Sequence, residues 1–97
     1  MMTIDDALLQ EFKRRMRISY DLDDENLRDI LSSSYAMIQS LCGRFDYKED
    51  RIGRTLTLEC ARYIYNDDTE FFQSNFKKDI QNFSIVNKKK ELISNEQ

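Results

Sequence analysis

Residues 23–43 read DDENLRDILSSSYAMIQSLCG and predict one long amphipathic helix. Apolar and small residues recur there at spacings of three and four, which places them on one face of the helix. Asp23 is expected to cap the first turn, with Leu22 and Leu27 as a hydrophobic staple around it, and Gly43 to close the last turn. Because the stripe is long and must be covered, the rest of the chain is expected to pack against this helix. The stripe consists of Leu27, Ile30, Leu31, Ser34, Tyr35, Ile38, Leu41 and Cys42.

Two amphipathic segments flank the central helix. The first runs from Thr3 to about Arg17, with Thr3 as its N-cap. The second begins between Asp46 and Asp50, since either residue is a plausible cap, and it continues to the polar run that starts at Asn66. Its apolar stripe consists of Ile52, Leu56, Cys60, Tyr63 and Ile64. The connector before the central helix is expected to pin the first helix in place through Ile18, Tyr20 and Leu22.

Phenylalanines dominate the last amphipathic segment, residues 70–86. Phe72, Phe76, Ile80 and Phe83 recur at helical spacing, with Phe71 and Ile85 beside them. The segment is either a fourth core helix or an anchor that buries itself in another subunit. The sequence therefore predicts an all-α fold, a small bundle of three to four helices with a flexible C-terminal tail. A single helical domain is expected over residues 1–87, followed by a polar, disordered tail over residues 88–97.

Composition narrows the classes of function. The 97 residues, 40% hydrophobic and 34% charged, fit one small domain, for which additional stabilisation by neighbouring copies would be unsurprising. The chain has no histidine, and its two glycines stand apart, so the commonest general base and a glycine-rich phosphate loop are both missing. Cys42 and Cys60 fall on apolar faces and are expected to be small buried hydrophobes in a reducing compartment. We therefore expect a protein without enzymatic activity, cofactor or metal.

Charge is unevenly distributed along the chain. Residues 19–50 contain eight acidic residues against three basic ones, so the acidic excess belongs to the central helix and its flanking loops. Lys13, Arg14, Arg15 and Arg17 form a basic cluster instead. That cluster fits a solvated helix end that complements the helix dipole, or a small nucleic-acid-binding regulator. A cytoplasmic adaptor that docks an amphipathic helix into a host protein would also explain the phenylalanines.

The start of the chain lacks a signal-peptide pattern, and no apolar run is long enough for a membrane span. The expected location is the cytoplasm in which the protein is made.

The order of these parts resembles the small head-tail connector proteins of tailed bacteriophages and prophages. The resemblance extends from about Leu22 to Ile85 and rests on DLDDENLRDILSSSYAMIQSLCG, the helix end ARYIYND and the segment FFQSNFKKDIQNFSI. The aromatic-rich helix end of that family is matched by Arg62, Tyr63, Tyr65 and Asn66. Its phenylalanine-containing segment is matched by Phe72, Asn75 and Phe76.

The resemblance implies a structural virion protein that forms a ring, usually of twelve copies, beneath the portal and extends the DNA channel toward the tail. Its partners would be the portal protein, neighbouring copies of itself, a further head-completion, stopper or tail protein, and passing DNA, with no membrane. It would be found in the host cytoplasm during assembly and then at the head-tail junction of the virion. The interface toward the portal or other subunits would comprise Tyr65, Asn66, Phe71, Phe72, Phe76, Ile80 and Phe83. The candidates for the acidic side of the channel, which should not grip phosphate, are Asp21, Asp23 and Asp46.

Overall fold

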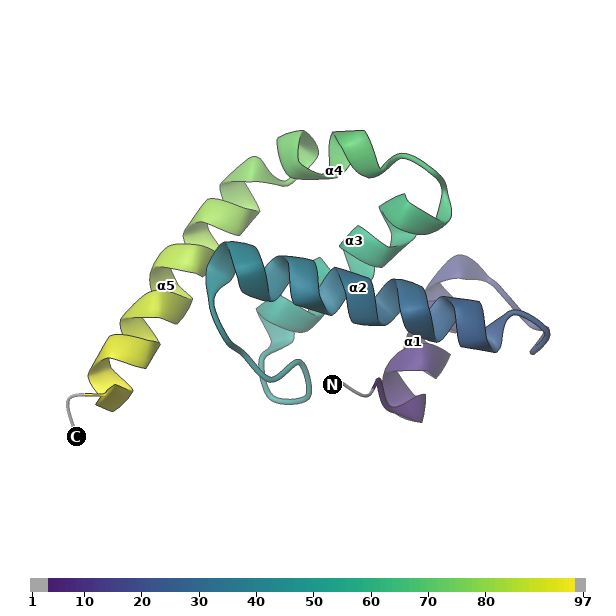
Figure 1. The fold of residues 1–97 in the computed structure, drawn as a ribbon, viewed down its shortest axis with the longest axis horizontal. Coiled ribbons are helices and arrows are strands. Elements are labelled where there is room, and N and C mark those ends of the chain that lie inside the picture. The colour runs from purple at the N-terminus through teal and green to yellow at the C-terminus, as the bar shows by residue number, and fades with distance from the viewer. Residues whose placement is uncertain (1–3, 96–97) are drawn as a thin grey trace.

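Five α-helices and no strand make up residues 4–95, the part of the chain that the computed structural model describes (Figure 1). They are α1 (Asp6–Met16), α2 (Asp24–Cys42), α3 (Arg51–Tyr65), α4 (Thr69–Asn75) and α5 (Lys77–Asn95). The predicted all-α class is confirmed. The predicted count of three to four helices is too low, because the phenylalanine-rich region forms two helices instead of one.

The central helix α2 contacts α1, α3 and α5 (Figure 1). Its predicted stripe is largely confirmed, since Leu27, Leu31, Ser34, Tyr35, Ile38 and Cys42 are all buried. Tyr35 holds the following loop, residues 43–50, against the helix, because its hydroxyl donates to the carbonyl of Phe45. The ring of Tyr35 also meets the rings of Phe45 and Tyr47 edge to face, with centroids 5.1 and 5.0 Å apart.

The two ends of α2 differ from the prediction in detail. Asp23 occupies the N-cap position, but its carboxylate makes no capping bond and instead accepts from the side-chain amide of Asn26, at 3.3 Å. Leu22 is 98% exposed, so the predicted staple with Leu27 is absent. Gly43 has φ 93° and ends the helix, as expected of a glycine that accepts positive φ.

The helices enclose two clusters of buried side chains. One lies between α1, the first half of α2 and the second half of α3, with Phe12, Leu27, Leu31 and Leu58 at its centre. The other gathers the last turns of α2, the middle of α3, α4 and the first half of α5 around Ile38, Cys60, Phe72 and Phe83. Phe45 packs against both clusters, so loop 43–50 joins them. Cys42 and Cys60 are free and buried in the second cluster, which confirms their predicted burial.

Local backbone contacts explain where α1 and α3 begin. The carboxylate of Asp5 accepts from the amide of Leu8 at 3.0 Å and caps α1, whereas the expected cap, Thr3, lies outside the described residues. Asp50 caps α3 in the same way, through the amide of Gly53 at 3.0 Å. A Cβ atom at Gly53 would lie 2.4 Å from the ring of Phe45, so only glycine allows this loop to approach α3 so closely.

The break between α4 and α5 falls at Phe76, where neither glycine nor proline marks it. The rings of Phe72 and Phe76 are stacked with centroids 5.1 Å apart, and each meets the ring of Tyr63 on α3 at 5.7 Å. These contacts hold α4 on α3, and the bend then directs α5 toward the C-terminal end of α2. Tertiary packing, which sequence periodicity does not report, therefore sets this break.

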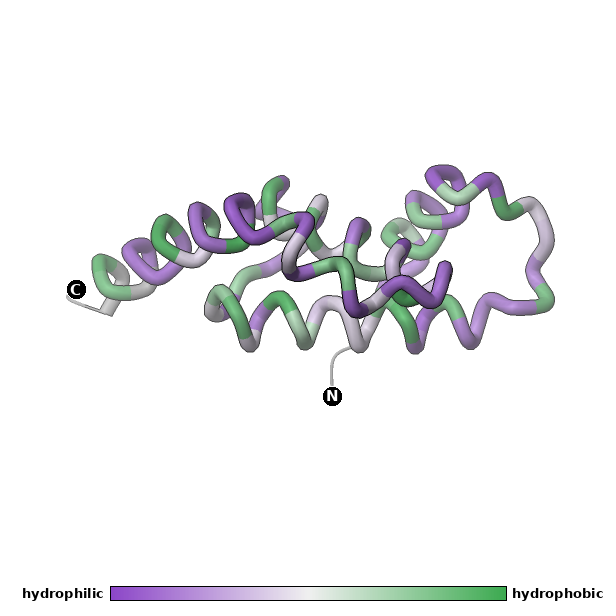
Figure 2. Tube along the Cα trace, turned by 90° about the horizontal axis from the view of Figure 1, so that it is seen from above, coloured by the Kyte–Doolittle hydropathy of each residue, from purple (hydrophilic) through white to green (hydrophobic). Residues whose placement is uncertain are grey.

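α5 continues to Asn95, through most of the region that was expected to be a disordered tail, residues 88–97. The sequence KKKELISN contains no helix-breaking residue, so the helix begun at Lys77 can propagate through it. The last turns of α5 extend beyond the rest of the molecule (Figures 1 and 2). Residues 96–97 of the expected tail lie outside the described residues.

Candidate assembly surfaces

Most residues predicted for an intermolecular interface lie in the protein's own core. Phe72 is 1% exposed and Phe83 is buried, while Phe76 and Ile80 pack against the second core cluster. Tyr65 packs against the first cluster, with its ring 6.3 Å from that of Phe12. The segment is thus a core element in the folded chain, the first of the two alternatives. The exposed members of the predicted set are Asn66 and Phe71.

The three aspartates predicted to face a DNA channel do not form one surface. Asp21 and Asp23 lie before the first turn of α2, whereas Asp46 lies in loop 43–50 next to Phe45, which is bonded to Tyr35. Tyr35 is about 18 Å along the helix axis from Asp23 at 1.5 Å per residue. The carboxylate of Asp46 also has a local function, since it accepts from the amide of Lys48 at 2.9 Å in the turn that follows.

Lys13 connects α1 to the corner that leads into α2. Its ammonium group donates to Asp21 and to Asp24, each at 2.7 Å, although the residue as a whole is only 4% exposed. The hydrogen bonds to these two aspartates raise the pKa of Lys13 above its ordinary value, and the bond from Lys13 lowers the pKa of Asp21. Of the predicted pinning residues, Ile18 is half-buried and Tyr20, although half-exposed, interacts with Tyr65 on α3, whereas Leu22 is exposed. The ion-pair clamp therefore holds the corner together with Ile18 and Tyr20.

The ion pairs of the basic cluster, residues 13–17, determine how many of its cations are available to bind nucleic acid. Lys13 is engaged within the chain, and Arg15 forms ion pairs with Glu11 at 3.3 Å and with Glu59 at 3.9 Å. Arg14 and Arg17 are exposed. Since Lys13 is buried and Arg15, although exposed, is paired with acidic side chains of its own chain, the cluster offers a weak basis for binding nucleic acid.

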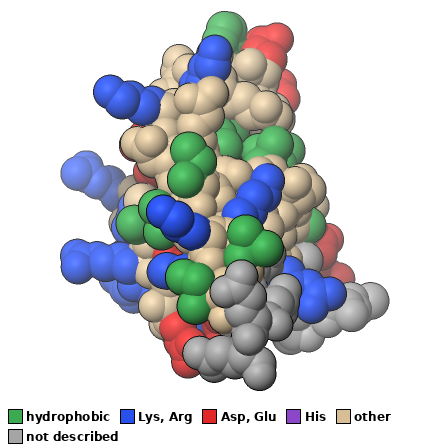
Figure 3. Space-filling model, turned by 90° about the vertical axis from the view of Figure 1, so that its left-hand side faces the viewer, with side chains coloured by type: hydrophobic (Ala, Val, Ile, Leu, Met, Phe, Trp, Pro, Cys, Tyr) green, Lys and Arg blue, Asp and Glu red, His purple; other side chains and the backbone are tan. Residues whose placement is uncertain are grey.

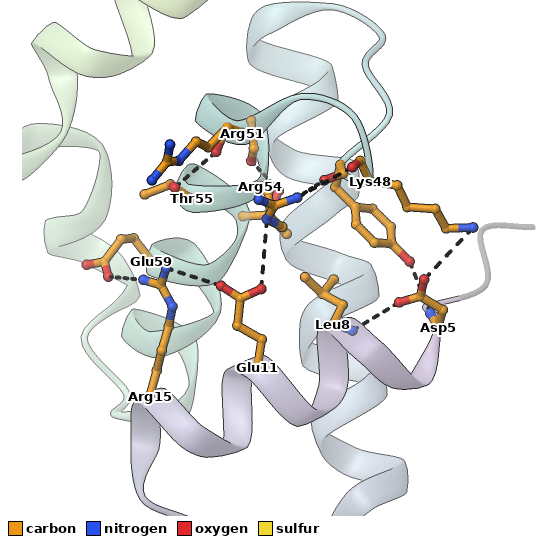
Figure 4. A network of polar contacts seen from close by, with 12 residues as sticks. Asp5, Leu8, Glu11, Arg15, Lys48, Arg51, Arg54, Thr55 and Glu59 are labelled. Carbon is orange, nitrogen blue, oxygen red and sulfur yellow. Dashed lines mark hydrogen bonds and ion pairs between the residues drawn. The ribbon is translucent and has the colours of Figure 1, made fainter.

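Charged side chains fill the seam between α1 and α3 (Figure 4). Glu11 lies between Arg15 and Arg54, and Arg54 also donates to the carbonyl of Tyr47 at 3.1 Å. Asp5 lies near the ammonium of Lys48, at 3.9 Å, and its amide donates to the Tyr47 hydroxyl at 3.0 Å. Opposite charges alternate through this seam, so its contacts fasten α1 and loop 43–50 to α3.

The outer face of α5 carries exposed apolar side chains that lie outside the interface predicted from the sequence. The face that α5 turns to the core carries Phe83 and Asn87, and at 100° per residue Ile85 and Leu92 lie on the opposite side of the helix. Val86 and Ile93 lie next to them, and all four side chains are exposed. An amphipathic helix at a protein surface normally turns a polar face to water. α5 instead has two apolar faces, of which its own chain covers one.

Lysines lie between and beside the apolar residues of this outer face. Lys77, Lys78, Lys88, Lys89 and Lys90 are all exposed on α5. Figure 3 looks onto this end of the molecule and shows hydrophobic side chains interleaved with lysine and arginine side chains. The periodicity that revealed the core face could have revealed the outer one, because Ile85 and Val86 recur seven residues later as Leu92 and Ile93. The second half of this repeat lies after Asn87, in the region expected to be a disordered tail, so the repeat was not counted as one helix face.

A groove runs between α5 and the last turn of α2. It has a volume of about 390 Å³ and is lined by Leu41, Ile80, Gln81, Ser84 and Ile85. The side-chain hydroxyl of Ser84 donates to the carbonyl of Leu41 at 3.4 Å and fixes the two walls together. One turn after Ser84, Lys88 places a positive charge at the same side of α5.

The described residues contain no group of three or more His, Cys, Asp or Glu side chains that could hold a metal ion. Within residues 4–95, no helix combines the length and the hydropathy needed to cross a membrane. Burial raises the pKa of both cysteine thiols, Cys42 and Cys60.

Comparison of the chain with models of protein families, with characterised proteins and with solved structures finds no match.

Proposed function

We propose that this chain is a structural subunit of the head-tail junction of a tailed bacteriophage or prophage. In this proposal several copies form a ring beneath the portal, extend the DNA channel and join the DNA-filled head to the tail. The observation that best supports an assembly role is the outer face of α5, where Ile85, Val86, Leu92 and Ile93 are exposed on a helix whose other face already closes the core. Exposed apolar side chains that gather on one face of a helix, here interleaved with lysines, favour a role in contacts with another protein.

A ring subunit must present two different surfaces that fit each other, one to each neighbour. Besides α5, the corner before α2 also exposes apolar side chains, at Tyr20 and Leu22. The chain therefore has an apolar surface at each of two separate places, as this kind of assembly requires. The further partners in the proposal are the portal protein, a stopper or tail protein below the ring, and DNA that passes without sequence-specific contacts.

In this proposal loop 43–50, rather than the corner before α2, faces the channel of the ring. Asp46 and Glu49 are exposed in that loop, whereas Asp21 is engaged by Lys13. Carboxylates there would repel the phosphates of passing DNA, since Lys and Arg contacts to phosphate dominate nonspecific affinity. In this proposal the protein is synthesised in the host cytoplasm and is then incorporated into the virion.

Electron microscopy of phage lysates tests the proposal. We expect a phage or prophage deleted for this gene to produce complete free tails beside unjoined heads, some of them without DNA. The complemented deletion, in which the chain is supplied from a plasmid, should restore joined virions. Normal virions from the deletion strain would refute a role at the head-tail junction.

A further inference from the structure

We propose that the outer face of α5 receives the corner before α2, residues 20–25, of a second copy of this chain. The inference rests on the proposed function and names the partner that covers α5. In this pairing the two copies associate head to tail, because each contributes a different surface to the contact. The donor surface is called the acidic corner below, and the receiving surface is the groove between α5 and α2 together with the outer face of α5.

The acidic corner combines an exposed leucine with negative charge. Leu22 is almost fully exposed, and two residues before it lies the half-exposed ring of Tyr20, whose hydroxyl interacts with Tyr65 of its own chain. Asp21 and Asp23 lie on either side of Leu22 in the sequence, and Glu25 follows three residues after it. Glu25 is exposed, whereas Asp21 is paired with Lys13 of its own chain. Leu22 fills no place in its own core, although its position next to the helix start would suit a staple. A contact with another molecule would give this side chain the apolar environment that its own chain does not provide.

The receiving surface has the complementary character. Its groove of about 390 Å³ has apolar walls at Leu41, Ile80 and Ile85, which suit the exposed side chain of a leucine. Lys88 lies one turn beyond the groove and Lys77 one turn before Gln81, both exposed on α5. An acidic, leucine-bearing corner thus meets an apolar groove between lysines, so charge and hydrophobicity both favour this pairing.

The same lysines disfavour a symmetric pairing of two α5 helices. Lys88, Lys89 and Lys90 lie between the apolar pair Ile85 and Val86 and the apolar pair Leu92 and Ile93. An antiparallel contact of two outer faces would bring both sets of lysines together, and like charges oppose each other at that range. The partner of this face should therefore be acidic.

The two surfaces lie far apart on one molecule. The longest dimension of the protein is 46 Å, and along it the corner between α1 and α2 occupies one end while α5 occupies the other (Figure 1). The α5 surface of one copy consequently cannot reach the acidic corner of the same copy. After two copies pair, one acidic corner and one α5 surface remain uncovered. Repetition of such a heterologous contact generates a closed ring or an open chain.

Disulfide trapping between full-length variants tests the pairing directly. We expect an equimolar mixture of Leu22→Cys and Ile85→Cys proteins to form a mixed disulfide dimer under mild oxidation. Both sites are exposed, and the native Cys42 and Cys60 are buried, so the introduced thiols are the accessible ones. The matched control is Gln10→Cys, an exposed position on α1 away from both surfaces, which should not form a disulfide with Ile85→Cys. Circular dichroism of each variant verifies that the fold is retained.

Each other outcome overturns the inference. A dimer that contains only Ile85→Cys protein would show that α5 pairs with itself. Equal trapping with Gln10→Cys would show nonspecific collision, and failure of the Leu22→Cys and Ile85→Cys mixture to form a disulfide would show that these surfaces do not meet.

A charge exchange measures whether the lysines select the acidic corner. We expect Glu25→Lys and Lys88→Glu to raise the dissociation constant of self-association about tenfold each, and the double variant to recover most of the loss. Sedimentation velocity over a range of protein and salt concentrations provides these constants. Additive losses in the double variant would overturn the electrostatic part of the inference.

The failure of this inference can be distinguished from failure of the proposed function. If the chain remains monomeric but its deletion still yields unjoined heads and tails, the junction role stands and the pairing is wrong. If the chain associates head to tail but the deletion strain makes normal virions, the pairing stands and the junction role is wrong.

Discussion

At the scale of single residues, Asn87 shows how one polar side chain can hold two helices together. It is buried, and its amide nitrogen donates to the carbonyl of Cys42 at 3.0 Å and to that of Arg44 at 2.9 Å. The carbonyls at a helix C-terminus lack partners within the helix, so Asn87 on α5 completes the end of α2. Asn87 is the predicted limit of the domain, because an isolated polar residue does not reveal which distant carbonyls its side chain will contact.

Replacement of Asn87 by leucine should lower the free energy of unfolding by about 1–3 kcal/mol, because two buried carbonyls lose a donor. Urea unfolding followed by circular dichroism measures the change. The control is Asn82→Leu on the exposed side of the same helix, which should change stability by less than about 0.5 kcal/mol. Equal effects at both positions would contradict the capping role of Asn87.

The clamp of Lys13 on Asp21 and Asp24 predicts a pH-dependent contribution to stability. The pKa of Asp21 is lowered in the folded protein, so its contribution is complete above the ordinary value of 3.8 and is lost as the pH falls through the lowered pKa. We therefore expect Asp21→Asn to destabilise the protein at neutral pH but to have little effect in strong acid. Unfolding midpoints in urea across this pH range measure the difference.

A double variant separates the clamp from other effects of Asp21. In a Lys13→Met background, Asp21→Asn should no longer destabilise the protein at neutral pH, because the partner charge is gone. The pKa of Lys13 is raised, so on the alkaline side the clamp should persist up to its ordinary value of 10.5 and weaken as the pH rises through the raised pKa. A loss of the clamp well below that value would contradict the assigned contacts.

At the scale of helices, α4 tests whether the phenylalanine segment is part of the core. Phe72 is 1% exposed and its neighbour Phe71 is 51% exposed. Phe72→Ala should lower the free energy of unfolding by about 3–5 kcal/mol because it leaves a cavity beside Tyr63 and Phe76. Phe71→Ala should cost less than about 1 kcal/mol. Chemical denaturation of the two variants measures both values, and similar small losses would show that the segment is not held in the core.

The helices differ in how much of them the sequence predicts. α2 and α3 follow from apolar stripes with capping residues and breakers at their ends, which are local signals. The bend at Phe76 has no local signal, because the stacking of Phe72 and Phe76 on Tyr63 is a tertiary contact. The staple expected at Leu22 is absent because the Lys13 clamp holds the corner instead, and a side chain so distant in sequence is not part of a capping pattern.

At the scale of the whole molecule, removal of the last turns of α5 should leave the stability of the fold almost unchanged. Leu92 and Ile93 are exposed, whereas Asn87 is the last buried residue among those described. A chain that ends after Asn87 should therefore lose less than about 1 kcal/mol of stability. Its self-association should nevertheless weaken, because Lys88 and the second half of the outer face are gone. Thermal unfolding and sedimentation velocity on the same sample measure the two properties.

The whole arrangement was only partly predictable. The all-α class follows from periodicity, but the acidic residues counted together in residues 19–50 are distributed to different parts of the surface. The cause is loop 43–50, which returns along α2 because the Tyr35 hydroxyl and the Gln39 amide both donate to the carbonyl of Phe45. Such bonds depend on where a loop lies in space, and a charge count along the chain does not contain that information.

The contact of Tyr35 with Tyr47 and Phe45 also has an optical consequence. The chain has no tryptophan, so its near-ultraviolet circular dichroism arises from tyrosine and phenylalanine. Rings held edge to face in one orientation give such a signal, and rings that reorient freely lose it. The unlabelled protein therefore reports the fixed packing of its aromatic rings, those of loop 43–50 on α2 among them, at wavelengths separate from those that report its helices.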